Sequence, residues 1–121
     1  MAWKVEYTDQ FEKWWDEDLT VEDQRRITAA VERLEQRGPT LGRPWVDSIV
    51  GSQHSNMKEL RPVGTTIRVF FIFDPRRIAI LLIGGDKAGR WRKFYSRMVR
   101  TADRLYDEHL EQIRPGTKGE N

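Results

Sequence analysis

Residues 66–83, TIRVFFIFDPRRIAILLI, decide what kind of fold this 121-residue chain can form. Two runs, 66–73 and 78–83, are rich in β-branched and aromatic residues, and each has the length of a strand rather than the roughly 20 residues of a membrane helix. Between them, Asp74-Pro75-Arg76-Arg77 has proline at a favoured turn position. Together with a third run at 57–61, this pattern predicts an antiparallel β-meander.

The chain upstream of the meander predicts one short strand followed by helices. Residues 3–7 alternate between apolar and polar, and Thr8 is placed to cap a short helical turn. Thr20 begins a helix over about 20–37, because acidic residues occupy its first turn and a single apolar stripe follows at helical spacing. The stripe consists of Ile27, Ala30, Val31 and Leu34, and Gly38-Pro39 ends the helix.

The remaining segments complete a predicted α+β domain. Residues 38–56 have no period and are predicted to be a loop, and residues 84–97 form a second loop rich in Lys and Arg. Apolar residues recur at steps of four, three and four from Met98 to His109, which predicts a C-terminal helix. We therefore expect one domain over 1–113, with the N-terminal helices on one face of the meander, a partly apolar cleft on the other, and a disordered tail at 114–121.

The residue types that are scarce limit the possible chemistry. The chain has no cysteine, which excludes disulfides, thiolate metal sites and a cysteine nucleophile. Its two histidines are not expected to form a zinc site, so neither a metal nor another cofactor is predicted. Residues 1–7 show no signal-peptide pattern, and the prediction is a soluble cytoplasmic protein.

The formal net charge of +2 conceals an uneven distribution along the chain. Residues 1–53 carry a net charge of −4, residues 54–97 carry +7, and residues 98–121 carry −1. A basic middle third inside an almost neutral chain suggests a polyanionic partner.

The basic residues of this middle third predict contact with RNA, because they follow one another on strands that a meander brings together. Arginine and lysine neutralise phosphates, while interleaved aromatic residues such as Trp91 and Phe94 stack on unpaired bases. A solvated surface of mixed charge is the alternative. In a regular strand Lys58 points away from Arg61, so both face RNA only across a bulge or twist. The predicted RNA-binding residues are Lys58, Arg76, Arg77, Arg92 and Lys93.

Two residues of the basic region are candidates for catalysis on their own chemistry. Arg68 lies in the middle of an apolar strand, a costly position for an arginine that has no function. Tyr95 is surrounded in sequence by cations that would lower its pKa and allow it to take a proton from a ribose 2′-hydroxyl, while arginines stabilise the phosphate. The alternative for Tyr95 is an aromatic ring packed under the last helix.

Three weaker signals complete the search for a site. Residues 84–89 have the glycine spacing of a phosphate-binding loop but not its Lys and hydroxyl residue, so a turn is predicted there instead of nucleotide hydrolysis. His54 has a side chain suited to proton transfer near neutral pH. Asp86 is either an acid/base residue that orients Lys87 or simply a turn residue, and Glu59 is expected to pair with a neighbouring base.

The ordered set of motifs resembles the phage-derived Gp49-like branch of the HigB/RelE toxins over roughly residues 3–110. The resemblance implies a RelE-like fold and metal-independent cleavage of messenger RNA, commonly in the ribosomal A site, which inhibits translation. It also implies a cognate antitoxin, often a helix-turn-helix (HigA-like) protein. The motifs are Lys58-Glu59-Leu60-Arg61, Arg68-Val69-Phe70-Phe71, Asp74-Pro75-Arg76-Arg77, Gly84-Gly85-Asp86-Lys87 and Phe94-Tyr95.

By position, the resemblance implies a role for individual residues. Arg68 matches the strand arginine that contacts the scissile phosphate, and Arg61 matches a basic residue at the end of the preceding strand. Lys87 stands where the family has arginine or lysine after the last strand, and Tyr95 lies near the family's C-terminal tyrosine. His54 resembles an active-site histidine of some HigB toxins.

Other classes of function stay open at this point. Basic residues alone do not distinguish RNA cleavage from RNA binding, so a non-catalytic RNA-binding or regulatory module is one alternative. A degenerate toxin that retains only antitoxin binding is another. The acidic helical face near residues 16–35 is either a surface that contacts protein or a solvated face.

Overall fold

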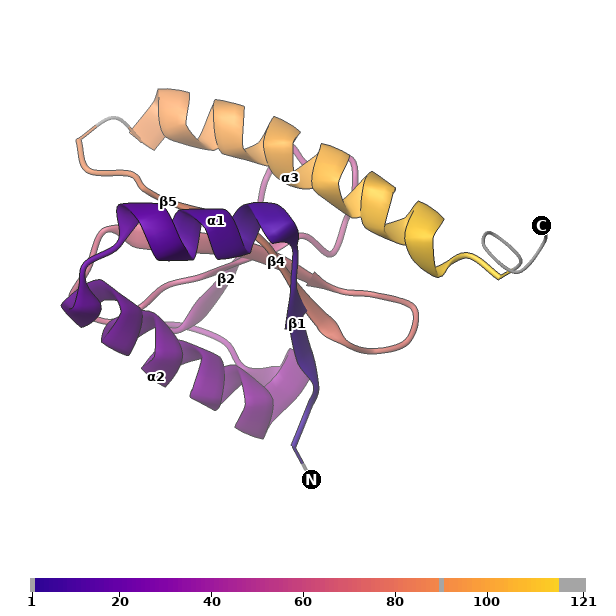
Figure 1. The fold of residues 1–121 in the computed structure, drawn as a ribbon, viewed down its shortest axis with the longest axis horizontal. Coiled ribbons are helices and arrows are strands. Elements are labelled where there is room, and N and C mark those ends of the chain that lie inside the picture. Colours follow the sequence, from indigo (N-terminus) through magenta and orange to yellow (C-terminus); the bar gives the residue numbers. More distant parts are fainter. Residues whose placement is uncertain (1, 90, 116–121) are drawn as a thin grey trace.

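A computed structural model describes residues 2–89 and 91–115, which form a five-stranded sheet and three α-helices (Figure 1). The order of strands across the sheet is β1-β5-β4-β3-β2. The strands are β1 (Val5–Tyr7), β2 (Val46–Ser48), β3 (Lys58–Leu60), β4 (Ile67–Phe73) and β5 (Ala79–Asp86). The helices are α1 (Asp9–Asp18), α2 (Val21–Arg37) and α3 (Trp91–Ile113), with a 3₁₀ turn, η1, at Gly38–Thr40.

The predicted meander is confirmed, and two further strands extend it. β3, β4 and β5 are consecutive antiparallel neighbours, and β1 adds to β5 in parallel, with Val5 opposite Ala79. The prediction of a loop throughout 38–56 is wrong at Val46–Ser48, where β2 pairs with β3. Only Val46 of this strand is buried, opposite Leu60, so the strand is too short to show a period in the sequence.

The predicted helix starts are confirmed by their caps. The Thr8 side chain accepts a hydrogen bond from the Phe11 backbone, and at α2 the Thr20 side chain accepts from the Asp23 backbone at 3.0 Å. The Asp23 carboxylate accepts in return from the Thr20 backbone, which completes a capping box. Gly38 ends α2 with φ of +59°, and a Cβ at this position would lie 2.3 Å from the Trp3 ring. Only glycine therefore fits this turn.

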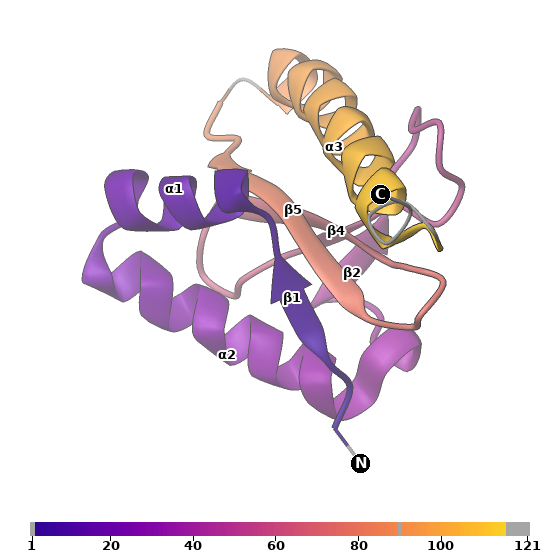
Figure 2. The ribbon, with the colours of Figure 1, turned by 45° about the vertical axis from the view of Figure 1, so that its right-hand side comes forward.

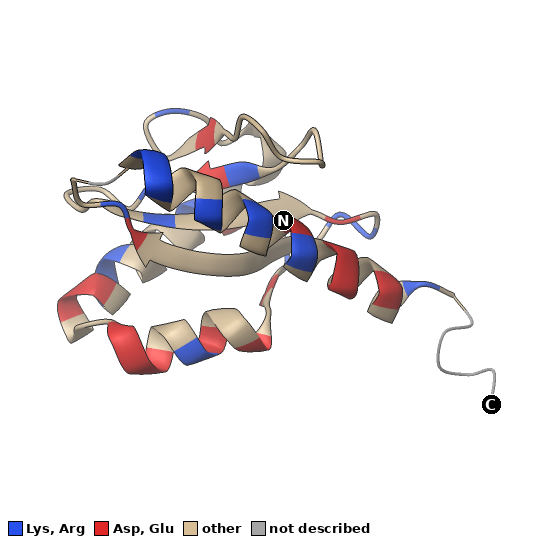
Figure 3. Ribbon diagram, turned by 90° about the horizontal axis from the view of Figure 1, so that it is seen from above, with Lys and Arg blue, Asp and Glu red and all other residues tan. Residues whose placement is uncertain are grey.

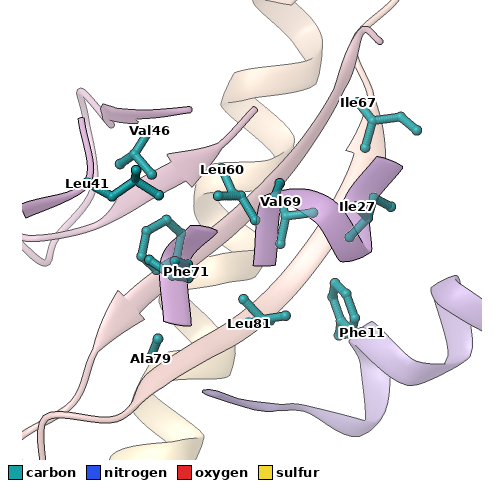
Figure 4. Packing of buried hydrophobic residues seen from close by; sticks show 12 residues of the cluster. Phe11, Ile27, Leu41, Val46, Leu60, Ile67, Val69, Phe71, Ala79 and Leu81 are labelled. Atoms are coloured by element: carbon teal, nitrogen blue, oxygen red, sulfur yellow. The ribbon is translucent and has the colours of Figure 1, made fainter. Parts of the chain in front are cut away.

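The sheet is covered on both faces, and α3 occupies the face on which a cleft was predicted. α1 and α2 pack on one face and α3 on the other (Figures 1 and 2). Val69 and Phe71 of β4 point into the first core with Phe11 of α1 and Ile27 of α2 (Figure 4). Phe70 of β4 lies in the second core beneath α3. Both faces of β4 are apolar because both are covered by helices.

β5 is longer than predicted because helices approach both sides of its two glycines. The strand continues through Gly84 and Gly85 to Asp86, although these glycines were expected to end it. A Cβ on Gly84 would lie 2.3 Å from the Trp14 ring of α1, and one on Gly85 would lie 2.9 Å from Phe94 of α3. The glycine pair is therefore a packing site and not a flexible turn.

α3 begins at Trp91, so the second half of the predicted basic loop at 84–97 is helical. Phe94 and Met98 lie one turn apart and are both buried over the sheet, and this apolar stripe continues to Tyr106. The density of Lys and Arg around Phe94 hides the start of the stripe. Of the predicted tail at 114–121, residues 116–121 lie outside the described residues. Among the helices of 2–89 and 91–115, none is long and apolar enough to cross a membrane.

Candidate functional site

Three side chains from three elements meet beneath the first turns of α3. Glu59 of β3 and Arg68 of β4 are nearly buried, with 7% and 8% of their side chains exposed. The Tyr95 hydroxyl of α3 donates a hydrogen bond to Glu59 Oε1 at 2.5 Å, and Arg68 Nε lies 3.8 Å from the same oxygen. We call Glu59, Arg68 and Tyr95 the central cluster. It joins a carboxylate, a guanidinium and a phenol at the boundary between the sheet and α3.

Arg61 and Asp47 extend the central cluster toward the solvent. Arg61 Nε lies 3.8 Å from Glu59 Oε2, and Arg61 Nη1 lies 3.8 Å from Asp47 Oδ2. Asp47 stands opposite Glu59 in the β2–β3 register, so β2, which the sequence did not predict, supplies the outer carboxylate. The side chain of Arg61 is 33% exposed, which makes it the accessible arginine of the site.

Arg68 contacts two groups of the protein, and its Nε–H stays without an acceptor among the described residues. Its Nη1 donates to the backbone carbonyl of Ile67 at 2.7 Å. Its Nε is buried and has no hydrogen-bond partner within the described chain, since Glu59 at 3.8 Å is beyond hydrogen-bond distance. A buried guanidinium N–H without an acceptor is unfavourable, so an added anion would satisfy a group that the protein leaves open.

Tyr95 has the opposite electrostatic environment from the one expected. Burial, the hydrogen bond to Glu59 and the Glu59 charge together raise the pKa of Tyr95 to about 12, and nearby Arg68 offsets only part of this. The prediction that neighbouring cations lower this pKa is wrong, because the side chain turns inward to a carboxylate. The ring also packs near Phe70 and Phe94, as the alternative of an aromatic under the last helix required.

Further basic residues near the central cluster lie around the start of α3. Lys87 follows β5, and its backbone N–H donates to the Thr66 carbonyl, continuing the β4–β5 ladder on the side of Arg68. Arg92 and Lys93 are exposed and, with Trp91, line a pocket of about 320 Å³. Figure 3 shows basic residues along the N-terminal half of α3 and acidic ones along its C-terminal half. We call Lys87, Trp91, Arg92 and Lys93 the basic rim.

Three predicted RNA-binding residues lie elsewhere. Lys58 stands opposite Phe71 and alternates with the buried Glu59, which places it on the face of the first core, away from Arg61 as strand alternation predicts. Arg76 and Arg77 lie in the β4–β5 turn, beyond the end of β4 that is remote from Arg68. The expectation that the meander gathers all the basic residues is therefore wrong for these three, because the strands separate residues along their length.

Arg76 and Arg77 are both engaged in their own surroundings. Arg76 pairs with the fully buried carboxylate of Asp74 at 2.8 Å and with Glu6 at 3.2 Å. His109 also contacts Asp74, at 2.9 Å, and these contacts hold the pKa of Asp74 below its usual value despite burial. Arg77 stacks over the Trp3 ring at 5.4 Å. These contacts tie α3 and β1 to the turn.

The two weaker candidates are also placed by local contacts. His54 Nε2 contacts Asp107 Oδ1 at 2.8 Å, and its ring meets Tyr106 edge-on, so it joins the 49–57 loop to the C-terminal half of α3. Asp86 accepts hydrogen bonds from the Thr66 hydroxyl and the Ala88 backbone, as a turn residue does. Neither side chain contacts the central cluster.

Sequence reasoning gave Glu59 only a pairing role and did not identify Asp47, Asp74 or Asp103. The one available signal was the position of Glu59 in a short apolar strand, where a carboxylate needs a partner. Within the described residues, no group of three or more His, Cys, Asp or Glu side chains is arranged to hold a metal ion.

Solved structures define the class of fold. The RelE–RelB complex of Pyrococcus horikoshii OT3 matches 74% of this chain and 99% of that chain, with a TM-score of 0.58 at 16% identity. The isolated Escherichia coli RelE toxin matches 80% of this chain and 99% of its own, with a TM-score of 0.57 at 8% identity. At these identities the likeness shows the fold alone, which is that of RelE-like toxins.

Sequence comparison then shows the family. Residues 13–107 match the model of the phage-derived Gp49-like proteins. "Putative toxin HigB3" of Mycobacterium tuberculosis (strain ATCC 25618 / H37Rv) is 50% identical over 84% of this chain and 88% of its own length. "Putative toxin HigB2" of the same strain is 46% identical over 82% of this chain, which spans 51% of that protein. The chain belongs to the Gp49-like family, the HigB-type branch of the HigB/RelE toxin superfamily.

Proposed function

We propose that this HigB-type toxin is an endoribonuclease that cleaves messenger RNA without a metal ion, on the ribosome, and thereby inhibits translation. The observation that carries the proposal is the central cluster. A guanidinium with an unpartnered N–H and a protonated phenol both lie within 4 Å of the same oxygen of a carboxylate, next to the basic rim. These are the groups that transfer of a phosphodiester to a neighbouring hydroxyl requires.

The geometry suggests a division of roles that differs from the one expected. Glu59 is the base, which takes the proton of the ribose 2′-hydroxyl as that oxygen attacks phosphorus. Arg68, assisted by Arg61, stabilises the negative charge on the crowded phosphate. Tyr95, with a pKa near 12, retains its proton and gives it to the departing 5′-oxygen. The products are a 2′,3′-cyclic phosphate and a free 5′-hydroxyl, and the proton on Glu59 then returns to the Tyr95 oxygen 2.5 Å away, which restores both groups.

RNA reaches Arg68 only if the cover of the central cluster moves. The Arg68 side chain is 8% exposed. It faces Glu59, and Glu59 in turn accepts a hydrogen bond from Tyr95 of α3, so this part of the helix covers the arginine. A phosphate that takes the place of the Tyr95–Glu59 hydrogen bond would satisfy the open Arg68 Nε. The basic rim would hold the flanking nucleotides, with Lys87, Arg92 and Lys93 on phosphates and the exposed Trp91 ring on a base.

An antitoxin is the second partner in the proposal. Structures with this fold were solved as complexes, RelE with RelB and DinJ with YafQ. We propose that this chain is likewise neutralised by a cognate antitoxin of the helix-turn-helix (HigA-like) class and acts in the cytoplasm.

A non-catalytic role is the second candidate, and the burial of Arg68 favours it. An arginine already facing a buried carboxylate is also explained as an internal ion pair, in which case the basic rim would bind RNA without cleaving it. A toxin that retains only antitoxin binding would show the same geometry.

Expression of wild-type protein and of Arg68→Lys in growing cells, with transcript ends mapped, tests the proposal. Lysine keeps the charge but not the planar fork, so we expect growth arrest and new RNA ends from wild type and at least about a 100-fold loss of cleavage in the variant. Arg25→Lys, an exposed arginine on α2, is the matched control and should behave as wild type.

The same experiment separates the alternatives. If Arg68→Lys fails to fold, Lys93→Ala replaces it as the test. This exposed substitution leaves the central cluster intact and should weaken RNA binding. Wild-type protein that binds RNA but produces no new ends would establish the non-catalytic role. Protein that has been treated with EDTA and then freed of the chelator should keep its activity on ribosomes, and lost cleavage that divalent metal added back to the protein restores would overturn the metal-independent mechanism.

A further inference from the structure

Residues of α1, α2 and β1 line a groove. Helices α1 and α2 lie on the face of the sheet opposite α3 (Figure 2). The volume of the groove is about 500 Å³, within the range of about 300–1,000 Å³ that is typical of binding pockets. Its floor is apolar and includes Phe11 and Trp15 of α1, Val31 of α2 and Leu81 of β5. We call this feature the helical groove. It takes no part in the proposed cleavage of RNA.

The walls of the helical groove carry charge of one sign only. Glu12 and Asp16 stand one turn apart on α1, and Glu32 and Glu35 stand one turn apart on α2. Among the described residues that line the groove, none is Lys, Arg or His. Two rows of carboxylates therefore face each other across an apolar floor.

These four carboxylates are not neutralised by the protein itself. Within the described part of the chain, none of them pairs with a basic side chain. On the same helix Glu22 pairs with both Arg25 and Arg26, so cations are available on α2 but lie outside the groove. Arg33 is taken up by the Trp45 ring, over which it lies at 5.1 Å.

We propose that the helical groove binds a basic amphipathic segment of another protein. Apolar side chains of the segment would enter the floor, and its Lys or Arg side chains would meet the two rows of carboxylates. RNA does not fit this charge. The inference rests on the proposed function in one respect, since under that function the segment belongs to the antitoxin.

The position of the groove has a consequence for regulation. The central cluster lies under α3, on the other face of the sheet, so a segment seated in the helical groove leaves the basic rim uncovered. A partner held there would form a complex in which the toxin still binds RNA, unless another part of the partner reaches across the sheet.

The experiment uses the full chain and a fluorescein-labelled 14-residue helical peptide with leucines on one face and lysines beside them. A twin peptide with Glu in place of Lys is the first control. We expect the basic peptide to bind and its affinity to fall at least about tenfold in Glu12→Gln/Glu32→Gln, measured by fluorescence anisotropy. Glu17→Gln/Asp18→Asn removes two charges from α1 outside the groove and should leave binding unchanged.

Cleavage of RNA is measured on the same samples, because Glu12 and Glu32 lie outside the central cluster. Peptide binding that depends on the groove supports the inference even if no cleavage is detected, in which case only the proposed function fails. Equal binding by the basic and acidic peptides, or an equal loss in both double variants, would overturn the inference. So would self-association of the chain that Glu12→Gln/Glu32→Gln abolishes, since the occupant would then be a second copy.

Discussion

Glu59 connects every functional group of the site. One of its oxygens accepts from Tyr95 and faces Arg68, and the other faces Arg61. Its charge neutralises the buried arginine and raises the pKa of the tyrosine at the same time. A substrate phosphate would have to compete with this carboxylate for the same arginines.

Glu59→Gln separates binding from chemistry. Glutamine keeps an oxygen that can accept from Tyr95 but removes the negative charge that faces the arginines. We expect RNA to bind several-fold more tightly, and cleavage to fall at least about 100-fold because the base is lost. Asp47→Asn, which pairs with Arg43 and faces Arg61 but lies outside the central cluster, is the control and should keep cleavage. Weaker RNA binding with unchanged cleavage in Glu59→Gln would contradict the assigned role.

Tyr95→Phe should make the folded protein less sensitive to alkali. Because the folded-state pKa is raised from 10 to about 12, the protonated phenol contributes stability that is complete below pH 10 and is lost as pH rises through 12. We expect the variant to be about 1 kcal/mol less stable in urea at pH 8, and this difference to shrink by pH 11. Tyr7→Phe, an exposed tyrosine, should show no such convergence. An equal difference at both pH values would contradict the assignment.

At the scale of elements, polar contacts that are separate from the central cluster hold α3 over the sheet. Asp103, in the middle of the helix, accepts from the Ser52 hydroxyl at 2.6 Å and from the Gln53 backbone at 3.0 Å. Nearer the C-terminus, His109 packs onto Asp74 of the β4–β5 turn. The start of α3, which covers Arg68, depends instead on Tyr95 and on Phe94 over Gly85.

Asp103→Asn tests the contacts of Asp103 with Ser52 and Gln53. The amide keeps one acceptor for Ser52, but its NH₂ group cannot accept from the Gln53 backbone N–H, which is left without a partner. We expect the free energy of unfolding in urea to fall by about 1–3 kcal/mol. Asp107→Asn, which removes the charge from the more exposed contact to His54 but keeps an acceptor oxygen, should cost under about 1 kcal/mol. A larger loss in Asp107→Asn than in Asp103→Asn would reverse this ranking.

Across the whole molecule, the sheet separates surfaces of opposite charge. The basic rim lies at the start of α3, and the acidic helical groove lies between α1 and α2 on the other face. A nearly neutral chain can therefore offer one surface to a polyanion and another to a basic segment. The β4–β5 turn, although basic in sequence, belongs to neither surface because Asp74 and Glu6 neutralise Arg76.

The salt dependence of binding to single-stranded RNA measures which residues contact phosphate. Each phosphate contact contributes about 0.7 to the slope of log K against log salt concentration for single strands. Lys93→Ala should lower the slope by about this amount, whereas Arg77→Ala, in the remote turn, should leave it unchanged. An equal reduction by both variants would mean that RNA extends along the whole sheet.

The sequence by itself determined the elements with local causes. The capping threonines, the α2 stripe, the Gly38 stop and the three meander strands are set by neighbours within a few residues, so they were predictable. The ordered motifs also identified the HigB/RelE superfamily. β2 and the first turns of α3 were missed because both depend on distant contacts: β2 pairs with β3, and the start of α3 packs over the sheet.

Only the tertiary structure decided the electrostatics of the site. Sequence neighbours place Tyr95 among cations, but one turn of helix directs its hydroxyl to Glu59, 36 residues away, and the sign of its pKa shift reverses. Pairing of β3 with β4 brings Glu59 close to Arg68, which lies near the start of β4. Arg76 and Arg77 follow the other end of β4 and therefore lie at the far end of the sheet. Charge interactions act through space, so the tertiary structure determines which acidic and basic groups surround each side chain. A basic run in the sequence therefore need not form a basic surface.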